Sequence, residues 1–102
     1  MEKEVDEMEF ILKQDGNQGA YIHEVNGANV AEITWTQLGD VMVMDHTFVD
    51  DSLRGQGVAK QLLDTAANYA RKNHYKMEPV CSYVVAAFER SNTYDDIKVS
   101  KA

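Results

Sequence analysis

The chain has 102 residues and a formal net charge of −7, from 17 acidic and 10 basic residues. This length favours one domain with a modest core, and the negative charge disfavours nonspecific nucleic-acid binding, which depends on neutralising phosphates. The single cysteine, Cys81, excludes an intramolecular disulfide and a cysteine-rich zinc site, and no apolar run approaches the length of a membrane span.

The two ends of the chain bound the expected domain. Residues 1–7 are polar, so we expect them to be frayed, and residues 8–102 to form the single domain. The first residues, MEKEVDEMEF, lack the basic and then apolar order of a signal peptide, which makes the cytoplasm the expected location, without membrane contact. The three histidines show no short ligand spacing, so no metal site is expected.

The first half of the chain predicts an antiparallel meander. Its β-branched and aromatic residues fall into four segments that read as strands, at 8–13, 20–25, 30–38 and 41–49. Short turn signals separate them: Asp15-Gly16 within the loop 14–19, then Asn26-Gly27 and Gly39-Asp40. We expect Trp35, Met42 and Met44 to lie in the core.

The spacing of apolar residues changes in the second half. Val58, Leu62, Leu63, Ala66, Tyr69 and Ala70 predict a helix over about 57–72 with one buried stripe. A short fifth strand at 75–81 and a second helix at 82–91 follow, with Ser82 as its expected N-cap. The fourth and fifth strands should pair in parallel through a right-handed crossover. Pro79 cannot donate to a ladder, so the fifth strand should leave its neighbour there or lie at an edge.

A glycine-rich, cationic turn, SLRGQGVAKQLL at 52–63, precedes the first predicted helix. Backbone N–H groups at a helix start form a concave anion site, and small residues allow a phosphate to approach the backbone. A dinucleotide fingerprint needs a third glycine where this chain has Lys60, and the phosphate loop of nucleotide hydrolases needs a different spacing. The turn therefore favours another phosphate-containing ligand.

The same turn resembles the acetyl-CoA-binding motif of the GCN5-related N-acetyltransferases. That motif follows a strand and has the core Q/R-x-x-G-x-G/A, which residues 54–59 match. His46-Thr47 before the motif, Pro79-Val80-Cys81-Ser82 after the fifth strand and an aromatic-rich segment at 88–94 resemble the compact YjdJ-like subgroup, over roughly residues 10–97. The resemblance implies a minimal α+β fold: a four-strand antiparallel meander, a helix, a splayed parallel fifth strand and a C-terminal helix.

The resemblance also implies a cofactor, acetyl-CoA, and residues that bind it. We expect these to be Val49, Arg54, Gly55, Gln56, Gly57, Val58, Ala59 and Lys60, with Asn92 and Tyr94 from the C-terminal segment. Full-size members carry two helices between their first two strands and two further strands at the end. This chain has only residues 14–19 in the first gap, so most of the usual acceptor-binding apparatus is absent.

Cys81 and His46 are the candidate catalytic residues. Cys81 lies between a strand and a helix N-terminus, a position that favours the thiolate and allows it to accept an acetyl group; the alternative is a small buried hydrophobic side chain. His46, late in the fourth strand, could deprotonate an amine or activate Cys81; the alternative is a histidine satisfied by hydrogen bonds at the sheet end. Tyr83 or Tyr94 could protonate the departing CoA thiolate.

The resulting hypothesis is an acetyl-CoA-dependent N-acetyltransferase that acts on a small amine or a peptide amine. The amine attacks directly, or Cys81 first takes the acetyl group. The alternative is a CoA-binding sensor or interaction module with little turnover, which the missing acceptor elements motivate. We expect a monomer or a weak dimer that binds no nucleic acid.

Overall fold

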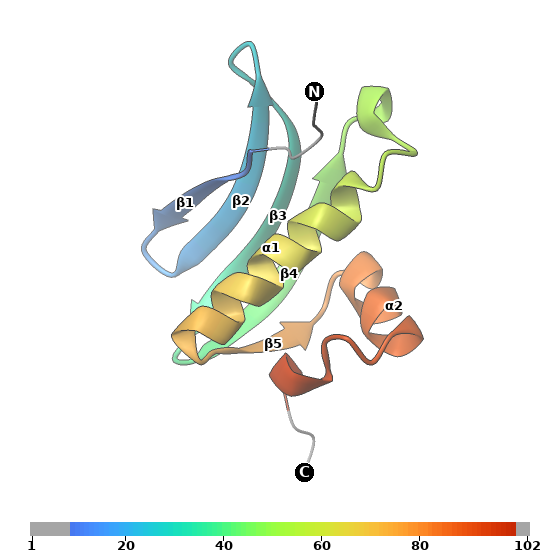
Figure 1. Ribbon diagram of the computed structural model, residues 1–102. Coiled ribbons are helices and arrows are strands. Elements are labelled where there is room, and N and C mark those ends of the chain that lie inside the picture. Colours follow the sequence, from blue (N-terminus) through green and yellow to red (C-terminus); the bar gives the residue numbers. More distant parts are fainter. Residues whose placement is uncertain (1–8, 100–102) are drawn as a thin grey trace, which may run out of the picture.

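A computed structural model describes residues 9–99, which form one mixed sheet with two helices (Figure 1). The strands lie in the order of the sequence: β1 (Ile11–Asp15), β2 (Gln18–Val25), β3 (Ala28–Leu38), β4 (Val41–Val49) and β5 (Lys76–Pro79). The first four pair antiparallel and β5 pairs parallel to β4. The predicted α+β fold class is confirmed, whereas the expected fraying of residues 1–7 lies outside the described residues.

The hairpins at the start of the sheet are tighter than the sequence suggested. Asp15 pairs with Gln18, so only two residues separate β1 from β2, and most of the predicted loop at 14–19 is strand. The β2–β3 turn has positive φ at both Asn26 (53°) and Gly27 (83°), as a type I′ turn requires. Strand pairing therefore continues up to each turn, which leaves no room for additional helices between the strands.

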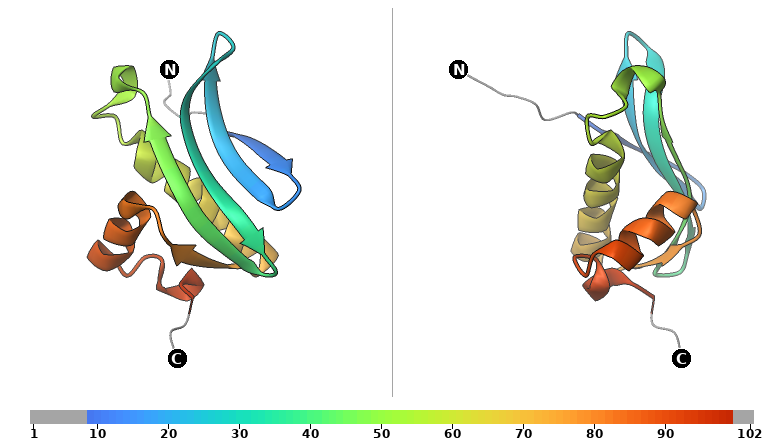
Figure 2. Two further views of the ribbon diagram at one scale, coloured as in Figure 1. Left: turned by 180° about the vertical axis from the view of Figure 1, so that it is seen from behind. Right: turned by 90° about the vertical axis from the view of Figure 1, so that its right-hand side faces the viewer.

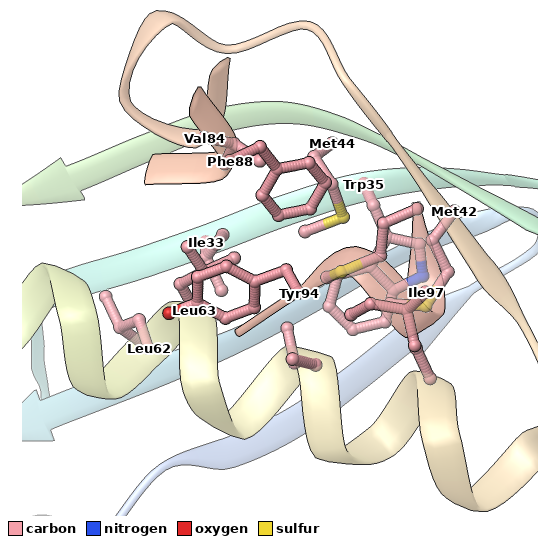
Figure 3. Close-up of a cluster of buried hydrophobic side chains, with 14 of the residues drawn as sticks. Ile33, Trp35, Met42, Met44, Leu62, Leu63, Val84, Phe88, Tyr94 and Ile97 are labelled. Carbon is pink, nitrogen blue, oxygen red and sulfur yellow. The ribbon is translucent and has the colours of Figure 1, made fainter. Parts of the chain in front are cut away.

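Helix α1 (Val58–Asn73) covers one face of the sheet. Its buried stripe of Leu and Ala side chains packs on the inner face of β3 and β4, where Trp35, Met42 and Met44 are also buried as predicted (Figure 3). A Cβ added at Gly19 would lie 2.4 Å from Cε2 of Trp35, so the indole occupies the space above this glycine. In the views of Figure 2, no helix of residues 9–99 covers the opposite face of the meander.

A bulge in β4 decides which side chains face the helix. Thr34 pairs with His46 but Trp35 pairs with Met44, so Asp45 is the extra residue. Met42 and Met44 face α1 before the bulge. After it, Thr47 and Val49 face α1, since they pair with the buried residues Ile33 and Ala31. Even-numbered residues of β4 thus face the helix before the bulge, and odd-numbered residues face it after the bulge.

The sheet splits where β5 ends. Pairing with β4 stops at Met44 and Pro79, and Val80 N and Cys81 N both donate to Met44 O, at 3.3 and 2.9 Å. The fifth strand is therefore shorter than predicted and leaves β4 at the proline, as expected. Helix α2 (Ser82–Arg90) begins at once, with Cys81 as its N-cap residue and without a side-chain capping bond, so the prediction of Ser82 as N-cap is wrong.

Candidate functional site

A cavity of about 510 Å³ opens between the end of β4, the glycine turn and the first turns of both helices. It lies on the helix-facing side of the split sheet, where the diverging strands leave space that no side chain of residues 9–99 fills. Six of its lining residues were predicted to bind the cofactor: Val49, Arg54, Gly55, Gly57, Val58 and Ala59. The other three are Thr47, Leu53 and Tyr83.

The turn that forms one wall of the cavity needs glycine at two positions. Gly55 and Gly57 have φ of 83° and 72°, in the left-handed region that residues with a Cβ disfavour. A Cβ at either position would meet nothing within 4 Å, so the space above both residues is open. A short helical turn, η1 (Asp51–Leu53), precedes them and is capped by Asp50, whose carboxylate accepts from Ser52 N at 3.0 Å.

The N-terminus of α1 points backbone donors at this opening. Gly57 is the N-cap and offers no side-chain acceptor, and the first backbone hydrogen bond runs from Gln61 N to Gly57 O at 3.1 Å. The N–H groups of Val58, Ala59 and Lys60 therefore remain available, and the helix dipole favours a negative charge beside them. Arg54 adds a guanidinium at the rim, where its Nε lies 2.8 Å from Asp51 Oδ1.

The backbone of β4 supplies a donor at the other end of the cavity. Asp50 N donates to Val30 O at 2.8 Å. In an antiparallel strand, the N–H groups of successive residues point alternately to one side and the other. Because Asp50 N–H points to β3, the N–H groups of Val49 and Thr47 point away from β3. They face the side from which β5 has departed, which leaves Val49 N–H available to a ligand.

Cys81 lies beside Thr47 at this split. Its Sγ is 3.4 Å from Thr47 Oγ1. Burial by itself raises the pKa of the Cys81 thiol, but the Thr47 hydroxyl, with smaller effects of the nearby backbone N–H groups of Val84, Tyr83 and Thr47, outweighs it and lowers the pKa below its usual value. The site therefore raises the thiolate fraction of Cys81, and no cationic side chain of residues 9–99 is among the groups that lower its pKa.

His46 lies on the opposite face of the sheet from Cys81. It pairs with Thr34, its side chain is 58% exposed, and its Nε2 lies 3.9 Å from Glu32 Oε2 on the outer surface. The bulge at Asp45 causes this, since it directs Thr47 rather than His46 toward the helices. The structure does not bring His46 and Cys81 together, so direct activation of the thiol by His46 is not supported. A role of His46 toward an amine stays a prediction.

The C-terminal residues are divided between the cavity and the core. Tyr83 lines the cavity; burial and Asp64 raise the pKa of its hydroxyl, while Lys60 and Arg90 oppose that shift. Tyr94 is only 3% exposed, and its hydroxyl donates to Asp64. Burial and this hydrogen bond raise the pKa of Tyr94 far above its usual value.

Four predicted cofactor residues do not line the main cavity. One of them, Gln56, directs its side-chain amide to Ser52 O at 3.5 Å. Asn92 lies in a polar hollow at the C-terminal end of α2, together with Glu89 and Lys98. Lys60 and Tyr94 line a smaller hollow between α1 and α2, which Tyr83 also borders. The predicted contact of Asn92 with a ligand in the main cavity therefore has no geometric support, because the chain turns away after α2.

Three contributors were missed in the sequence: Thr47 and Leu53, which line the cavity, and Asp64. Thr47 was noted only as part of a family motif, because without the bulge its side chain could not be assigned to the inner face. Asp64 carried a weak signal, since it follows Lys60 by four residues on the same helix and such pairs meet.

The comparisons with known proteins identify relatives along most of the chain. The family model of the GCN5-related N-acetyl-transferases matches residues 20–97. A GCN5-like candidate N-acetyltransferase from Staphylococcus aureus is 33% identical, with a TM-score of 0.66 over 90% of each chain.

Two more distant structures share the fold. A ribosomal-protein-alanine N-acetyltransferase from Brucella melitensis is 24% identical, with a TM-score of 0.59 over 87% of this chain and 66% of its own. A candidate streptothricin acetyltransferase from Bacillus anthracis, solved in complex with acetyl coenzyme A, is 22% identical, with a TM-score of 0.51 over 62% of this chain and 37% of its own. No curated protein matches the chain.

Metal and membrane sites find no support in the described part of the chain. Residues 9–99 contain no group of three or more His, Cys, Asp or Glu side chains arranged to hold a metal ion. None of their helices is long and apolar enough to cross a membrane.

Proposed function

Because this chain belongs to the GCN5-related N-acetyltransferases, a family of acyltransferases whose acetyl donor is acetyl-CoA, we propose that it transfers the acetyl group to the amine of a small molecule or a peptide. The observation that carries this proposal is the cavity itself. It joins a phosphate-compatible glycine turn at one end to the end of β4 at the other, where Val49 offers a backbone N–H and Thr47 contacts the Cys81 sulfur.

The residues present fit the two ends of acetyl-CoA. The open space above Gly55 and Gly57, the uncapped N–H groups of α1 and the Arg54 guanidinium suit a pyrophosphate. The Val49 N–H, which the split sheet exposes, suits a thioester carbonyl oxygen, and Val49, Leu53 and Val58 give that region an apolar lining. When bound there, acetyl-CoA supplies an activated acetyl group.

Different groups of the protein assist different steps of the reaction. Val49 N–H donates to the carbonyl oxygen and stabilises the charge that develops there when an amine adds to the carbonyl carbon. As the new C–N bond forms and the C–S bond breaks, the amine loses a proton to a base and the leaving thiolate takes one. The Tyr83 hydroxyl, which borders the cavity, is the proposed source of that second proton.

The base and the route of transfer define two versions of the proposal. In the direct version, the amine attacks the thioester and gives its proton to water, or to His46 if the amine approaches from the opposite face of the sheet. In the relay version, the Cys81 thiolate takes the acetyl group and releases CoA, and the amine then attacks this new thioester. The hydrogen bonds that favour the Cys81 thiolate support the relay version.

Steady-state transfer from labelled acetyl-CoA to a panel of small amines and amino-terminal peptides tests the proposed function. We expect at least one class of amine to be acetylated at a rate proportional to enzyme concentration. The Cys81→Ala variant separates the two routes: loss of transfer supports the relay, and an unchanged rate supports direct attack. Tight binding of acetyl-CoA without transfer to any amine would contradict the proposal.

The second candidate function is a CoA-binding sensor or interaction module with little turnover. The two-residue turn between β1 and β2 favours it, because full-size members of the family place acceptor-binding helices at that point. This candidate predicts CoA binding without transfer in the same assay. In either case we propose a cytoplasmic protein that acts as a monomer or a weak dimer, which sedimentation over a range of concentrations checks.

A further inference from the structure

The smaller hollow between α1 and α2, which we call the interhelix hollow, has a volume of about 250 Å³. Its α2 side consists of Tyr83, Ala86, Ala87 and Arg90. These residues are spaced as i, i+3, i+4 and i+7, so they share one face of the helix. The two alanines keep the hollow open, because an alanine side chain ends at Cβ.

The interhelix hollow adjoins the main cavity. Tyr83 lines both, and Ala59 of the main cavity is followed directly by Lys60 of the hollow. Lys60 therefore belongs to both spaces: its backbone N–H is one of the donors at the start of α1, and its side chain borders the hollow. A ligand whose diphosphate lies at the start of α1 has the hollow beside its next group.

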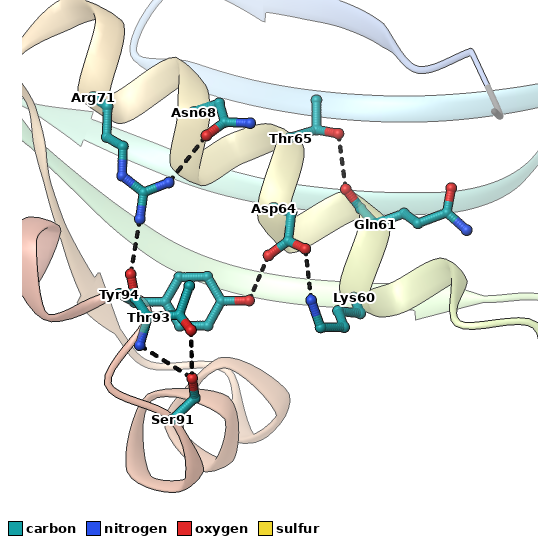
Figure 4. A network of polar contacts seen from close by, with 9 residues as sticks. All are labelled: Lys60, Gln61, Asp64, Thr65, Asn68, Arg71, Ser91, Thr93 and Tyr94. Atoms are coloured by element: carbon teal, nitrogen blue, oxygen red, sulfur yellow. Dashed lines mark hydrogen bonds and ion pairs between the residues drawn. The ribbon is translucent and has the colours of Figure 1, made fainter.

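The charge of the interhelix hollow is positive, although the chain as a whole carries a net charge of −7. Two cationic side chains, Lys60 and Arg90, line it together with no carboxylate. Lys60 Nζ is held 2.8 Å from Asp64 Oδ2, and the Tyr94 hydroxyl donates to the other oxygen of Asp64 (Figure 4). Arg90 pairs with no acidic side chain among residues 9–99. The hollow therefore favours an anion.

The segment after α2 adds a hydroxyl donor to the same hollow. Ser91 Oγ donates to Thr93 Oγ1 at 2.7 Å, and Thr93 N donates to Ser91 Oγ at 3.1 Å (Figure 4). The Thr93 hydroxyl thus accepts one bond within the chain and retains its own proton for a ligand. Arg71 of α1 fixes this segment, since its Nη2 donates to Thr93 O at 2.9 Å.

A phosphate monoester matches this combination of groups. In CoA, the diphosphate is followed by a ribose that carries a phosphate on its 3′ oxygen. Such a monoester has a charge of about −1.5 to −2 at neutral pH and three acceptor oxygens. Two cations and a hydroxyl donor can meet those oxygens with charge-assisted hydrogen bonds.

We propose that the interhelix hollow binds the 3′-phosphate of CoA, and that Arg90 and Lys60 thereby make the protein select CoA over 3′-dephospho-CoA, which lacks only that phosphate. The inference rests on the proposed function, because it concerns another part of the same cofactor. It gives the predicted cofactor residue Lys60 a ligand group outside the main cavity. It also adds Arg90, which the sequence did not single out, to the residues that recognise the cofactor.

Calorimetric titration of the whole chain with CoA and with 3′-dephospho-CoA tests this proposal. The parent should bind CoA at least about tenfold more tightly, which is the lower end for a hydrogen bond to a charged group. Arg90→Gln should reduce this preference to about two- to threefold by weakening CoA alone, because the contact it removes is absent from 3′-dephospho-CoA. Lys60→Gln should act in the same direction, although it also leaves the Asp64 carboxylate without its cation.

Two control variants lose the same single positive charge. Lys98→Gln removes a cation from the polar hollow at the end of α2, where Lys98 Nζ lies 3.0 Å from Asp95 Oδ1, and should leave both affinities unchanged. Arg54→Gln removes the cation proposed for the diphosphate, so it should weaken both ligands by the same factor. Circular dichroism and thermal unfolding establish that each variant is folded. If Arg90→Gln does not fold, Lys60→Gln decides.

The outcomes separate this inference from the proposed function. Equal affinities of the parent for the two ligands, or no binding of either, would overturn it. An equal loss of both ligands in Arg90→Gln would also overturn it, because Arg90 would then contact the adenine or the diphosphate. A loss of selectivity in Lys98→Gln would reduce the effect to net charge. Selective binding of CoA without acetyl transfer would contradict the proposed function and leave this inference standing.

Discussion

Replacing Thr47 by valine should make Cys81 less reactive at neutral pH. The change exchanges the hydroxyl for a methyl group of similar shape and removes the hydrogen bond to the sulfur, whose Sγ–Oγ1 distance is 3.4 Å. A hydrogen bond to a charged group contributes about 1.5–3 kcal/mol, and this length favours the lower end. Because 1.36 kcal/mol corresponds to a factor of ten, the thiolate fraction at neutral pH should fall about tenfold.

The observed rate should fall by less than the thiolate fraction. A thiolate of higher pKa is a better nucleophile, with a Brønsted coefficient of about 0.4–0.5, so the alkylation rate at neutral pH should drop about three- to fourfold. Above both pKa values the order reverses, and the variant should react about threefold faster than the parent. The two pH–rate profiles therefore cross.

Iodoacetamide alkylation followed by intact mass, from neutral to strongly alkaline pH, measures both profiles. Thr34→Val is the matched control, because Thr34 pairs with His46 on the outer face of the sheet and should leave the profile unchanged. Profiles of parent and Thr47→Val that superimpose would refute the reasoning. They would mean that the Thr47 hydroxyl does not stabilise the Cys81 thiolate.

Three further predictions concern the glycines and the cofactor site. Gly57→Ala and Gly16→Ala each place a Cβ at a similar positive φ in open space, so each should lower the free energy of unfolding by about 1–2 kcal/mol. Only Gly57→Ala should also weaken CoA binding, by about tenfold or about 1.4 kcal/mol as measured by calorimetry. Equal CoA affinities of the two variants would mean that the phosphates do not bind at this turn. Arg54→Ala should weaken binding less than Gly57→Ala and should reduce its salt dependence, since its guanidinium lies at the exposed rim; an unchanged salt dependence would exclude a phosphate contact. Gly19→Ala should lower the free energy of unfolding by about 1–3 kcal/mol in a urea titration, because the new methyl group overlaps the buried Trp35 ring, and a loss below about 0.5 kcal/mol would mean that the indole moves freely.

Much of the fold was predictable because local chemistry determines it. The β-branched segments, the Asn26-Gly27 turn and the helical spacing from Val58 each identify an element without reference to its neighbours. Pro79 likewise indicates the end of β5, since it cannot donate to a ladder. The glycine turn was predictable for the same reason, because its left-handed residues tolerate little else.

The parts of the site that were not predicted depend on tertiary geometry. Asp45 gives no sign in the sequence that it forms a bulge, and this bulge decides that Thr47 faces Cys81 while His46 faces away. The contact of Tyr94 with Asp64 depends on the path of the chain after α2, which has no periodic pattern. Residue type thus predicted the identity of the candidate groups, but not which of them meet.

The central claim is that the protein takes an acetyl group from acetyl-CoA at the split between β4 and β5 and passes it to an amine. Intact mass spectrometry of one mixture tests it most directly: the protein with acetyl-CoA alone, and then with the amine panel added. On either route we predict transfer of an acetyl group to an amine in the second step; on the relay route the parent, but not Cys81→Ala, also gains one acetyl group in the first. A parent that gains no acetyl group and acetylates no amine, while still binding acetyl-CoA, would contradict the claim.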